Sequence, residues 1–143
     1  MIKRPYKLLV IDDEEALLNI LKQYLEQKYP DILQVFVTPN PLTGLEIVKN
    51  EDINIAFVDL SMPEMSGDKV LREIKNMKQE CEVIILTGSS SFALCSACFY
   101  DGALSYLKKP FDFDELENVV NMAVQKFDYW SRIINKVVDT RKE

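Results

Sequence analysis

The stretch Leu8-Leu9-Val10-Ile11-Asp12-Asp13 is an aliphatic run that ends abruptly in two carboxylates, and the rest of the chain repeats its pattern. Further apolar runs follow, with segments of helical periodicity between them, at Gln34–Val37, Ile55–Val58, Val83–Leu86 and Ser105–Leu107. Short apolar runs that alternate with helical segments are typical of strands buried in a parallel sheet. We therefore predict an α/β fold: a doubly wound, five-stranded parallel sheet of order 2-1-3-4-5 that is followed by an extended C-terminal helix.

Three of the later runs also end in polar side chains that suit phosphoryl chemistry. Asp59 follows the run at 55–58, Thr87 follows the run at 83–86, and Lys109 comes two residues after the last run. Ligands of open parallel sheets bind at the carboxyl ends of the strands. We therefore expect three carboxylates, one hydroxyl and one ammonium to converge on one edge of the sheet: Asp12, Asp13, Asp59, Thr87 and Lys109.

The three carboxylates need a compensating positive charge. Two carboxylates about 5 Å apart repel each other by about 3 kcal/mol at an effective dielectric constant of about 20. A hard divalent cation prefers oxygen ligands, and Mg²⁺ also recruits water and phosphate oxygens. We therefore predict a Mg²⁺ site at Asp12, Asp13 and Asp59, with Lys109 as a further positive charge. The alternative is that Asp12 and Asp13 only cap the following helix, which leaves Asp59 and Lys109 without explanation.

The composition of the 143-residue chain indicates one domain with a modest extension. Its 23 acidic and 17 basic residues give a net charge of −6, which argues against non-specific nucleic-acid binding. No apolar stretch approaches the roughly 20 residues of a membrane span and no signal-peptide core is found, so we expect a cytoplasmic location without membrane contact. The sequence has no histidine, so any phosphohistidine must come from another protein.

Three cysteines, Cys81, Cys95 and Cys98, are too few for a disulfide framework. Cys95 and Cys98 form a CxxC motif within a predicted helix, where this spacing puts both thiols on one face. Because free cysteine packs like a small apolar residue, we expect core packing here rather than metal binding or redox chemistry.

Four motifs, in this order and at these spacings, resemble the receiver domains of two-component response regulators (the CheY-like family): residues 11–14 (IDDE), 58–67 (VDLSMPEMSG), 86–88 (LTG) and 102–111 (GALSYLKKPF). The resemblance covers about residues 5–125 and implies a flavodoxin-like fold. It divides the chain into a receiver domain at residues 1–125 and a helical extension at residues 126–143.

The resemblance also implies a role for each residue of the acidic edge. Asp59 would be the phosphoacceptor, whose carboxylate attacks a phosphoryl group and forms an acyl phosphate. Lys109 would neutralise charge on the transferring group, whereas Lys108 should lie on the opposite side of the strand. The implied Mg²⁺ ligands are Asp12, Asp13, Asp59 and the backbone carbonyl of Ser61.

Thr87 and Tyr106 occupy the positions of a conformational switch in this family. Thr87 would hydrogen-bond the phosphoryl oxygen, and its movement would open space for the Tyr106 ring, which has an apolar body and a polar tip. The face made by the fourth helix, fifth strand and fifth helix would then change shape. The alternative is that Tyr106 is an ordinary strand aromatic. We expect the aromatic residues of the fourth helix (Phe92, Phe99 and Tyr100) to pack within the domain rather than to contact a partner.

The final helix is expected to run to about Thr140 and to carry apolar residues at alternating spacings of four and three: Leu116, Val120, Ala123, Phe127, Trp130, Ile134 and Val137. This spacing is that of a heptad repeat. We expect the helix to support a homodimer or to lead to an output domain, and the alternative is that it folds back on its own domain.

We thus predict a phosphorylation-activated response regulator receiver that accepts a phosphoryl group from a histidine kinase, a His-containing phosphotransfer protein or a small acyl phosphate. It would catalyse only its own phosphorylation and dephosphorylation, without turnover of a separate substrate. Two alternatives are a docking module that is never phosphorylated and an Asp-nucleophile phosphatase of the haloacid-dehalogenase type. That phosphatase needs a second aspartate two residues after the nucleophile, where this chain has Ser61.

Overall fold

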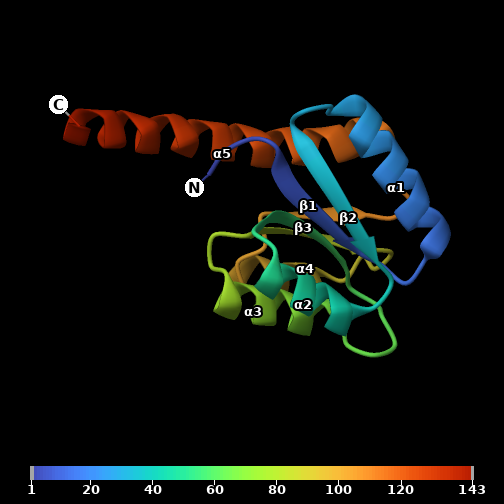
Figure 1. Ribbon diagram of the computed structural model, residues 1–143. Coiled ribbons are helices and arrows are strands. Elements are labelled where there is room, and N and C mark those ends of the chain that lie inside the picture. The colour runs from blue at the N-terminus through green and yellow to red at the C-terminus, as the bar shows by residue number, and fades with distance from the viewer. Residues whose placement is uncertain (1, 143) are drawn as a thin grey trace.

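A five-stranded parallel sheet with the order β2-β1-β3-β4-β5 forms the centre of the molecule, as the sequence predicted. The computed structural model describes residues 2–142. The strands are β1 (Tyr6–Ile11), β2 (Leu33–Thr38), β3 (Ile53–Asp59), β4 (Glu82–Thr87) and β5 (Ser105–Lys108). The helices are α1 (Glu15–Lys28), α2 (Pro41–Asn50), α3 (Gly67–Met77), α4 (Phe92–Tyr100) and α5 (Phe113–Lys142). Helices α1 and α5 cover one face of the sheet, and α2, α3 and α4 cover the other (Figure 1).

Both faces of the sheet are buried, which is why its inner strands read as unbroken apolar runs. Successive residues of β1 alternate between two cores, because neighbouring side chains of a strand point to opposite faces. Leu8 belongs to the core that contains residues of α1 and α5, whereas Leu9 belongs to the core that contains residues of α2 and α3. Cys98 is buried in the second core, and Cys95 is half-buried, in agreement with the expected packing role.

The loop between β3 and α3 returns tightly onto the end of β3. The Gly67 N–H donates to the Leu60 carbonyl at 2.8 Å, which closes the loop at the first residue of α3. A Cβ atom on Gly67 would lie 2.2 Å from the Asp59 carbonyl oxygen and 2.6 Å from the Leu60 Cα. Only glycine therefore allows the start of α3 to approach the backbone that carries Asp59.

Helix α5 is one continuous helix whose first half packs on the sheet and whose second half projects beyond it (Figure 1). Four residues of its apolar stripe are buried: Leu116, Val120, Ala123 and Phe127. Farther along, Trp130 is 48% exposed and Val137 is 49% exposed. The alternative in which the tail folds back on its own domain is therefore wrong. None of the helices within residues 2–142 has the length and apolar character of a membrane span.

A polar cluster fixes the N-terminal segment to the middle of α5. The Arg4 guanidinium donates from Nε and Nη2 to the two carboxylate oxygens of Asp128, at 3.1 and 2.5 Å. The Tyr6 hydroxyl donates to the Asp128 Oδ1 at 2.6 Å. The hydrogen bond from Arg4 lowers the pKa of Asp128 despite the opposing effect of burial, and Tyr6 lowers it further. Contacts of α5 with the body thus continue as far as Asp128.

Replacing Asp128 with asparagine is expected to lower the unfolding free energy by about 1 kcal/mol at neutral pH, because the charged acceptor is lost from a site that is one-third exposed. The pKa of Asp128 is lower in the folded than in the unfolded state, so its contribution is complete above the unfolded value of 3.8. The contribution is lost as the pH falls through the folded value. Urea titrations at a pH above 3.8 and at a pH below the folded pKa of Asp128 measure this loss of stability. The control is Asp139→Asn, which removes an exposed carboxylate of the same helix. An equal loss of stability at every pH would contradict this prediction.

Candidate functional site

The carboxyl ends of β1 and β3 bring the three predicted carboxylates together. Ile11 pairs with Val58 across the two strands, so the aspartates that follow them are neighbours. Carboxylate oxygens of Asp12, Asp13 and Asp59 all lie within 4.8 Å of one another. Asp12 and Asp59 are buried, whereas Asp13 is exposed at the rim. This donor set, oxygen only and anionic, fits a hard divalent cation such as Mg²⁺.

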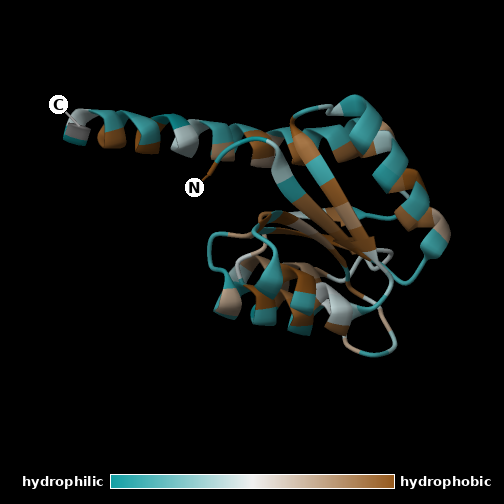
Figure 2. Cartoon of the chain, viewed as in Figure 1, coloured by the Kyte–Doolittle hydropathy of each residue, from teal (hydrophilic) through white to brown (hydrophobic). Residues whose placement is uncertain are grey.

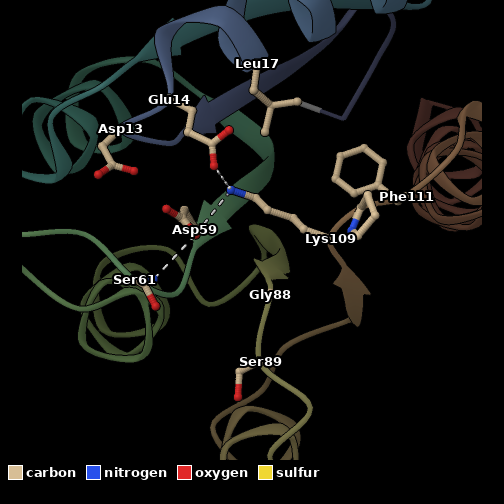
Figure 3. Close-up of a pocket in the computed structure, with 10 residues that line it drawn as sticks. Asp13, Glu14, Leu17, Asp59, Ser61, Gly88, Ser89, Lys109 and Phe111 are labelled. Atoms are coloured by element: carbon tan, nitrogen blue, oxygen red, sulfur yellow. Dashed lines mark hydrogen bonds and ion pairs between the residues drawn. The ribbon is translucent and has the colours of Figure 1, made fainter.

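The side chain of Lys109 reaches into this carboxylate cluster from the end of β5 (Figure 3). Its backbone N–H donates to the Thr87 carbonyl at 2.7 Å, which fixes the start of the side chain. Its ammonium nitrogen lies 2.7 Å from the Asp12 Oδ2, 3.2 Å from the Glu14 Oε1 and 3.6 Å from the Asp59 Oδ1. Lys108, the preceding residue, is exposed. Of the two adjacent lysines, Lys109 is thus the one that contacts the carboxylates.

Glu14 is a member of the site that sequence reasoning did not assign. Its carboxylate shares the Lys109 ammonium with Asp12, and its backbone N–H donates to the Asp12 Oδ1 at 2.9 Å. The sequence contained one indication that Glu14 belongs to the site, because Glu14 directly follows the paired aspartates. Its role could not be assigned because it depends on the turn into α1.

The pocket raises the pKa of both the Asp59 carboxyl group and the Lys109 ammonium group, for different reasons. Burial, followed by the charge of Asp12, raises the pKa of Asp59 to about 6 against the opposing effects of Lys109 and the Ser61 N–H. Burial lowers the pKa of Lys109, but the hydrogen bonds to Asp12 and Glu14 and the charges of Asp12 and Asp59 outweigh it and raise that pKa. The ammonium therefore stays charged. The difficulty of ionising Asp59 comes first from burial and then from the neighbouring charge of Asp12, and an added cation would offset both.

The backbone of Ser89 joins the two residues of the predicted switch. Thr87 is buried at the end of β4, and its Oγ1 accepts a hydrogen bond of 2.9 Å from the Ser89 N–H. The Tyr106 hydroxyl donates to the Ser89 carbonyl at 2.8 Å. Both side chains therefore hold the same peptide segment between β4 and α4. This link was not foreseen, because backbone groups carry no sequence signal.

An open cavity of about 690 Å³ lies above the carboxylates (Figure 3). Its polar lining includes Asp59, Ser61 and Lys109. Its apolar lining includes Leu17 from α1 and Phe111 from the loop between β5 and α5. These two apolar residues were not predicted, since they come from segments whose distance from Asp59 is set only by the fold.

The aromatic side chains of α4 correct a prediction. Phe92 is 86% exposed, Phe99 is 71% exposed and Tyr100 is 82% exposed, so the expectation that they pack within the domain is wrong. Helix α4 carries no charged residue, and its Cys98 side already fills the core. A helix that is apolar on all sides can bury only one of them, and the aromatic side faces solvent.

The fold and the pocket together define a class: flavodoxin-like domains that have a carboxylate cluster and a lysine at the carboxyl edge of the sheet. The family model of the response regulator receiver domain matches residues 8–121 of the chain. The chain therefore belongs to this family, and it is a receiver domain of two-component signalling.

Curated relatives and solved structures agree with this assignment. The chain is 27% identical over 121 residues to an uncharacterized response regulatory protein of Staphylococcus epidermidis, covering 85% of this chain and 47% of the relative. It is 29% identical over 114 residues to sporulation initiation phosphotransferase F of Bacillus subtilis, covering 80% of this chain and 90% of the relative. The crystal structure of a CheY-like receiver domain protein from Methanospirillum hungatei JF-1 matches with a TM-score of 0.81 at 25% identity, covering 87% of this chain and 97% of that one. The chain thus spans about half of the staphylococcal relative and most of the Bacillus one.

Proposed function

We propose that Asp59 accepts a phosphoryl group from the phosphohistidine of a sensor histidine kinase or a His-containing phosphotransfer protein. The observation that carries the proposal is the position of Asp59, which lines an open cavity with its carboxylate 3.6 Å from the Lys109 ammonium. The chain has no histidine of its own, so the donor is another protein or a small acyl phosphate. Receiver domains act with such kinases and phosphotransfer proteins, which agrees with this assignment.

The proposed transfer is a single displacement at phosphorus. A carboxylate oxygen of Asp59 attacks phosphorus, the bond to the donor nitrogen breaks, and its electron pair stays on that nitrogen. The Lys109 ammonium donates to the phosphoryl oxygens and balances their charge. Mg²⁺, when bound by Asp12, Asp13, Asp59 and the Ser61 carbonyl, supplies further positive charge at those oxygens. Water that reaches the same face hydrolyses the acyl phosphate, so the domain returns to its starting state without turning over a separate substrate.

We propose that the Ser89 peptide segment carries the signal from the site. In the phosphorylated state the Thr87 hydroxyl turns from the Ser89 N–H to a phosphoryl oxygen. The Ser89 segment is then released on one side, and the Tyr106 hydroxyl that holds its carbonyl moves with it. The exposed aromatic surface of α4 follows this segment directly in the chain, so the face of α4, β5 and α5 changes shape.

The proposal is tested by ¹⁹F NMR of beryllofluoride, a phosphoryl analogue, with and without Mg²⁺. The wild-type chain should give a bound signal only when Mg²⁺ is present, and Asp59→Asn should give none because the nucleophilic oxygen is absent. Asp52→Asn is the matched control, since this carboxylate is exposed and distant from the cluster. Binding that persists in Asp59→Asn, or that needs no Mg²⁺, would instead support a docking module that is not phosphorylated.

A further inference from the structure

An open cavity of about 660 Å³ lies between the N-terminal segment and the middle of α5. The segment that precedes β1 passes close to α5 (Figure 1), and it is hydrophilic there (Figure 2). Tyr6, which lines this cavity, begins β1, whereas Asp12 follows the last residue of the same strand. The cavity and the carboxylate pocket therefore lie at opposite edges of the sheet.

The charge of this cavity is opposite to that of the chain as a whole, which has a net charge of −6. Its lining includes three cationic side chains, those of Lys3, Arg4 and Arg132, and the carboxylate of Asp128. Arg4 already donates to both oxygens of Asp128. Among residues 2–142, neither Lys3 nor Arg132 has a carboxylate as an ion-pair partner. Two cationic groups of the cavity are thus left for an anion from outside the chain.

The walls of the cavity are fixed before any ligand arrives. Tyr6 is 1% exposed, and its hydroxyl donates to the Asp128 Oδ1 at 2.6 Å. The Arg4 guanidinium holds the same carboxylate from the other side of the chain segment, at 3.1 and 2.5 Å. These contacts set the separation between the N-terminal segment and α5. A ligand that binds between preformed walls loses less of its binding free energy to the ordering of side chains.

One wall of the cavity offers a planar stacking surface. Tyr129 lines the cavity and is 52% exposed, and the Arg132 guanidinium lies 6.0 Å from the centre of its ring. Nucleic-acid bases stack on tyrosine rings and on guanidinium planes. Gln125 and Ser131 also line the cavity, and their side chains can both donate and accept hydrogen bonds. This combination suits a heterocyclic base better than it suits an aliphatic acid.

We propose that this cavity binds a nucleoside phosphate. The base stacks on Tyr129 and Arg132, and the phosphate groups contact the Lys3 ammonium and the Arg4 guanidinium, since both kinds of cation bind phosphate. The volume of about 660 Å³ lies within the roughly 300–1,000 Å³ of small-molecule sites, and it is more space than inorganic phosphate fills. The bound ligand joins the N-terminal segment to α5 where the helix leaves the body, and it does not require Asp59.

Isothermal titration calorimetry with ADP and with GDP tests the binding. The titrations contain a chelator and no Mg²⁺, because Mg²⁺ would let phosphate oxygens bind at the carboxylate pocket. The wild-type chain and Asp59→Asn should bind at least one of the two nucleotides at one saturable site, with equal dissociation constants. Inorganic phosphate and adenosine, used as separate probes, should each bind about tenfold more weakly or worse. No saturable binding of either nucleotide, or binding of phosphate alone with equal affinity, would overturn the proposal.

Two pairs of variants test the residues of the cavity. Arg132→Gln should raise the dissociation constant of the nucleotide about tenfold, whereas Arg141→Gln, which removes an exposed arginine farther along the same helix, should leave it unchanged. Tyr129→Ala should raise it about fivefold or more, and Tyr129→Phe, which keeps the ring, should bind like the wild type. Urea titrations confirm that each variant is folded. Equal effects of the two arginine substitutions would show a general attraction of charge and overturn the proposal.

Discussion

Replacing Lys109 with methionine is expected to slow the phosphorylation of Asp59 by about 10²- to 10³-fold while it tightens Mg²⁺ binding by about tenfold. The two effects have opposite signs because the ammonium does two things in the pocket. It donates toward the transferring oxygens, and before that it competes with a cation for the carboxylates of Asp12 and Asp59, which lie 2.7 and 3.6 Å from it. A general loss of structure would weaken both properties together.

The same substitution should change stability in a way that Mg²⁺ reverses. Without Mg²⁺, removal of the ammonium leaves the buried Asp12 carboxylate without its ion-pair partner and lowers the unfolding free energy by about 2 kcal/mol. Mg²⁺ binds the folded state, so its addition should restore more stability to Lys109→Met than to the wild type. Lys108→Met is the matched control, because Lys108 is the adjacent lysine and is exposed.

Three measurements test these effects. Acyl phosphate formation from a small phosphodonor gives the rate of phosphorylation, calorimetry gives the Mg²⁺ affinity, and urea unfolding gives the stability. Lys108→Met should resemble the wild type in all of them. Normal phosphorylation of Lys109→Met, or equal effects of the two substitutions, would remove Lys109 from the proposed chemistry.

Replacing Gly67 with alanine is expected to lower the unfolding free energy by at least about 3 kcal/mol. The added methyl group would lie 2.2 Å from the Asp59 carbonyl oxygen, and that atom belongs to the backbone and cannot turn aside. The clash can be relieved only if the start of α3 or the end of β3 moves. Either movement displaces the Asp59 carboxylate, so Mg²⁺-dependent binding of beryllofluoride should also be lost.

Gly88→Ala provides the comparison for this effect. A Cβ atom on Gly88 would meet no heavy atom within 4 Å, so its unfolding free energy should stay within about 0.5 kcal/mol of the wild type. Urea titrations of both variants give the stabilities directly. A midpoint for Gly67→Ala that equals that of the wild type would show that the loop after β3 is more adaptable than its packing indicates.

The parts of the molecule that the sequence predicted are those set by short-range patterns. The sheet order followed from the apolar runs and the helices between them, and the convergence of Asp12, Asp13 and Asp59 followed from their places at strand ends. The exposed aromatic residues of α4 were predicted wrongly, because the helix is apolar on every side and periodicity could not tell which side is buried. The ion pair of Glu14 and the wall formed by Leu17 and Phe111 depend on distances between elements, which the order of residues along the chain does not specify.

Trp130 is the only tryptophan of the chain, and it lies on the projecting half of α5 rather than near the carboxylate pocket. Its indole is about half exposed, so its fluorescence is sensitive to whatever covers that part of the helix. Burial of the projecting helix against another surface would change this fluorescence. The chain thus carries an intrinsic optical probe of the projecting half of α5.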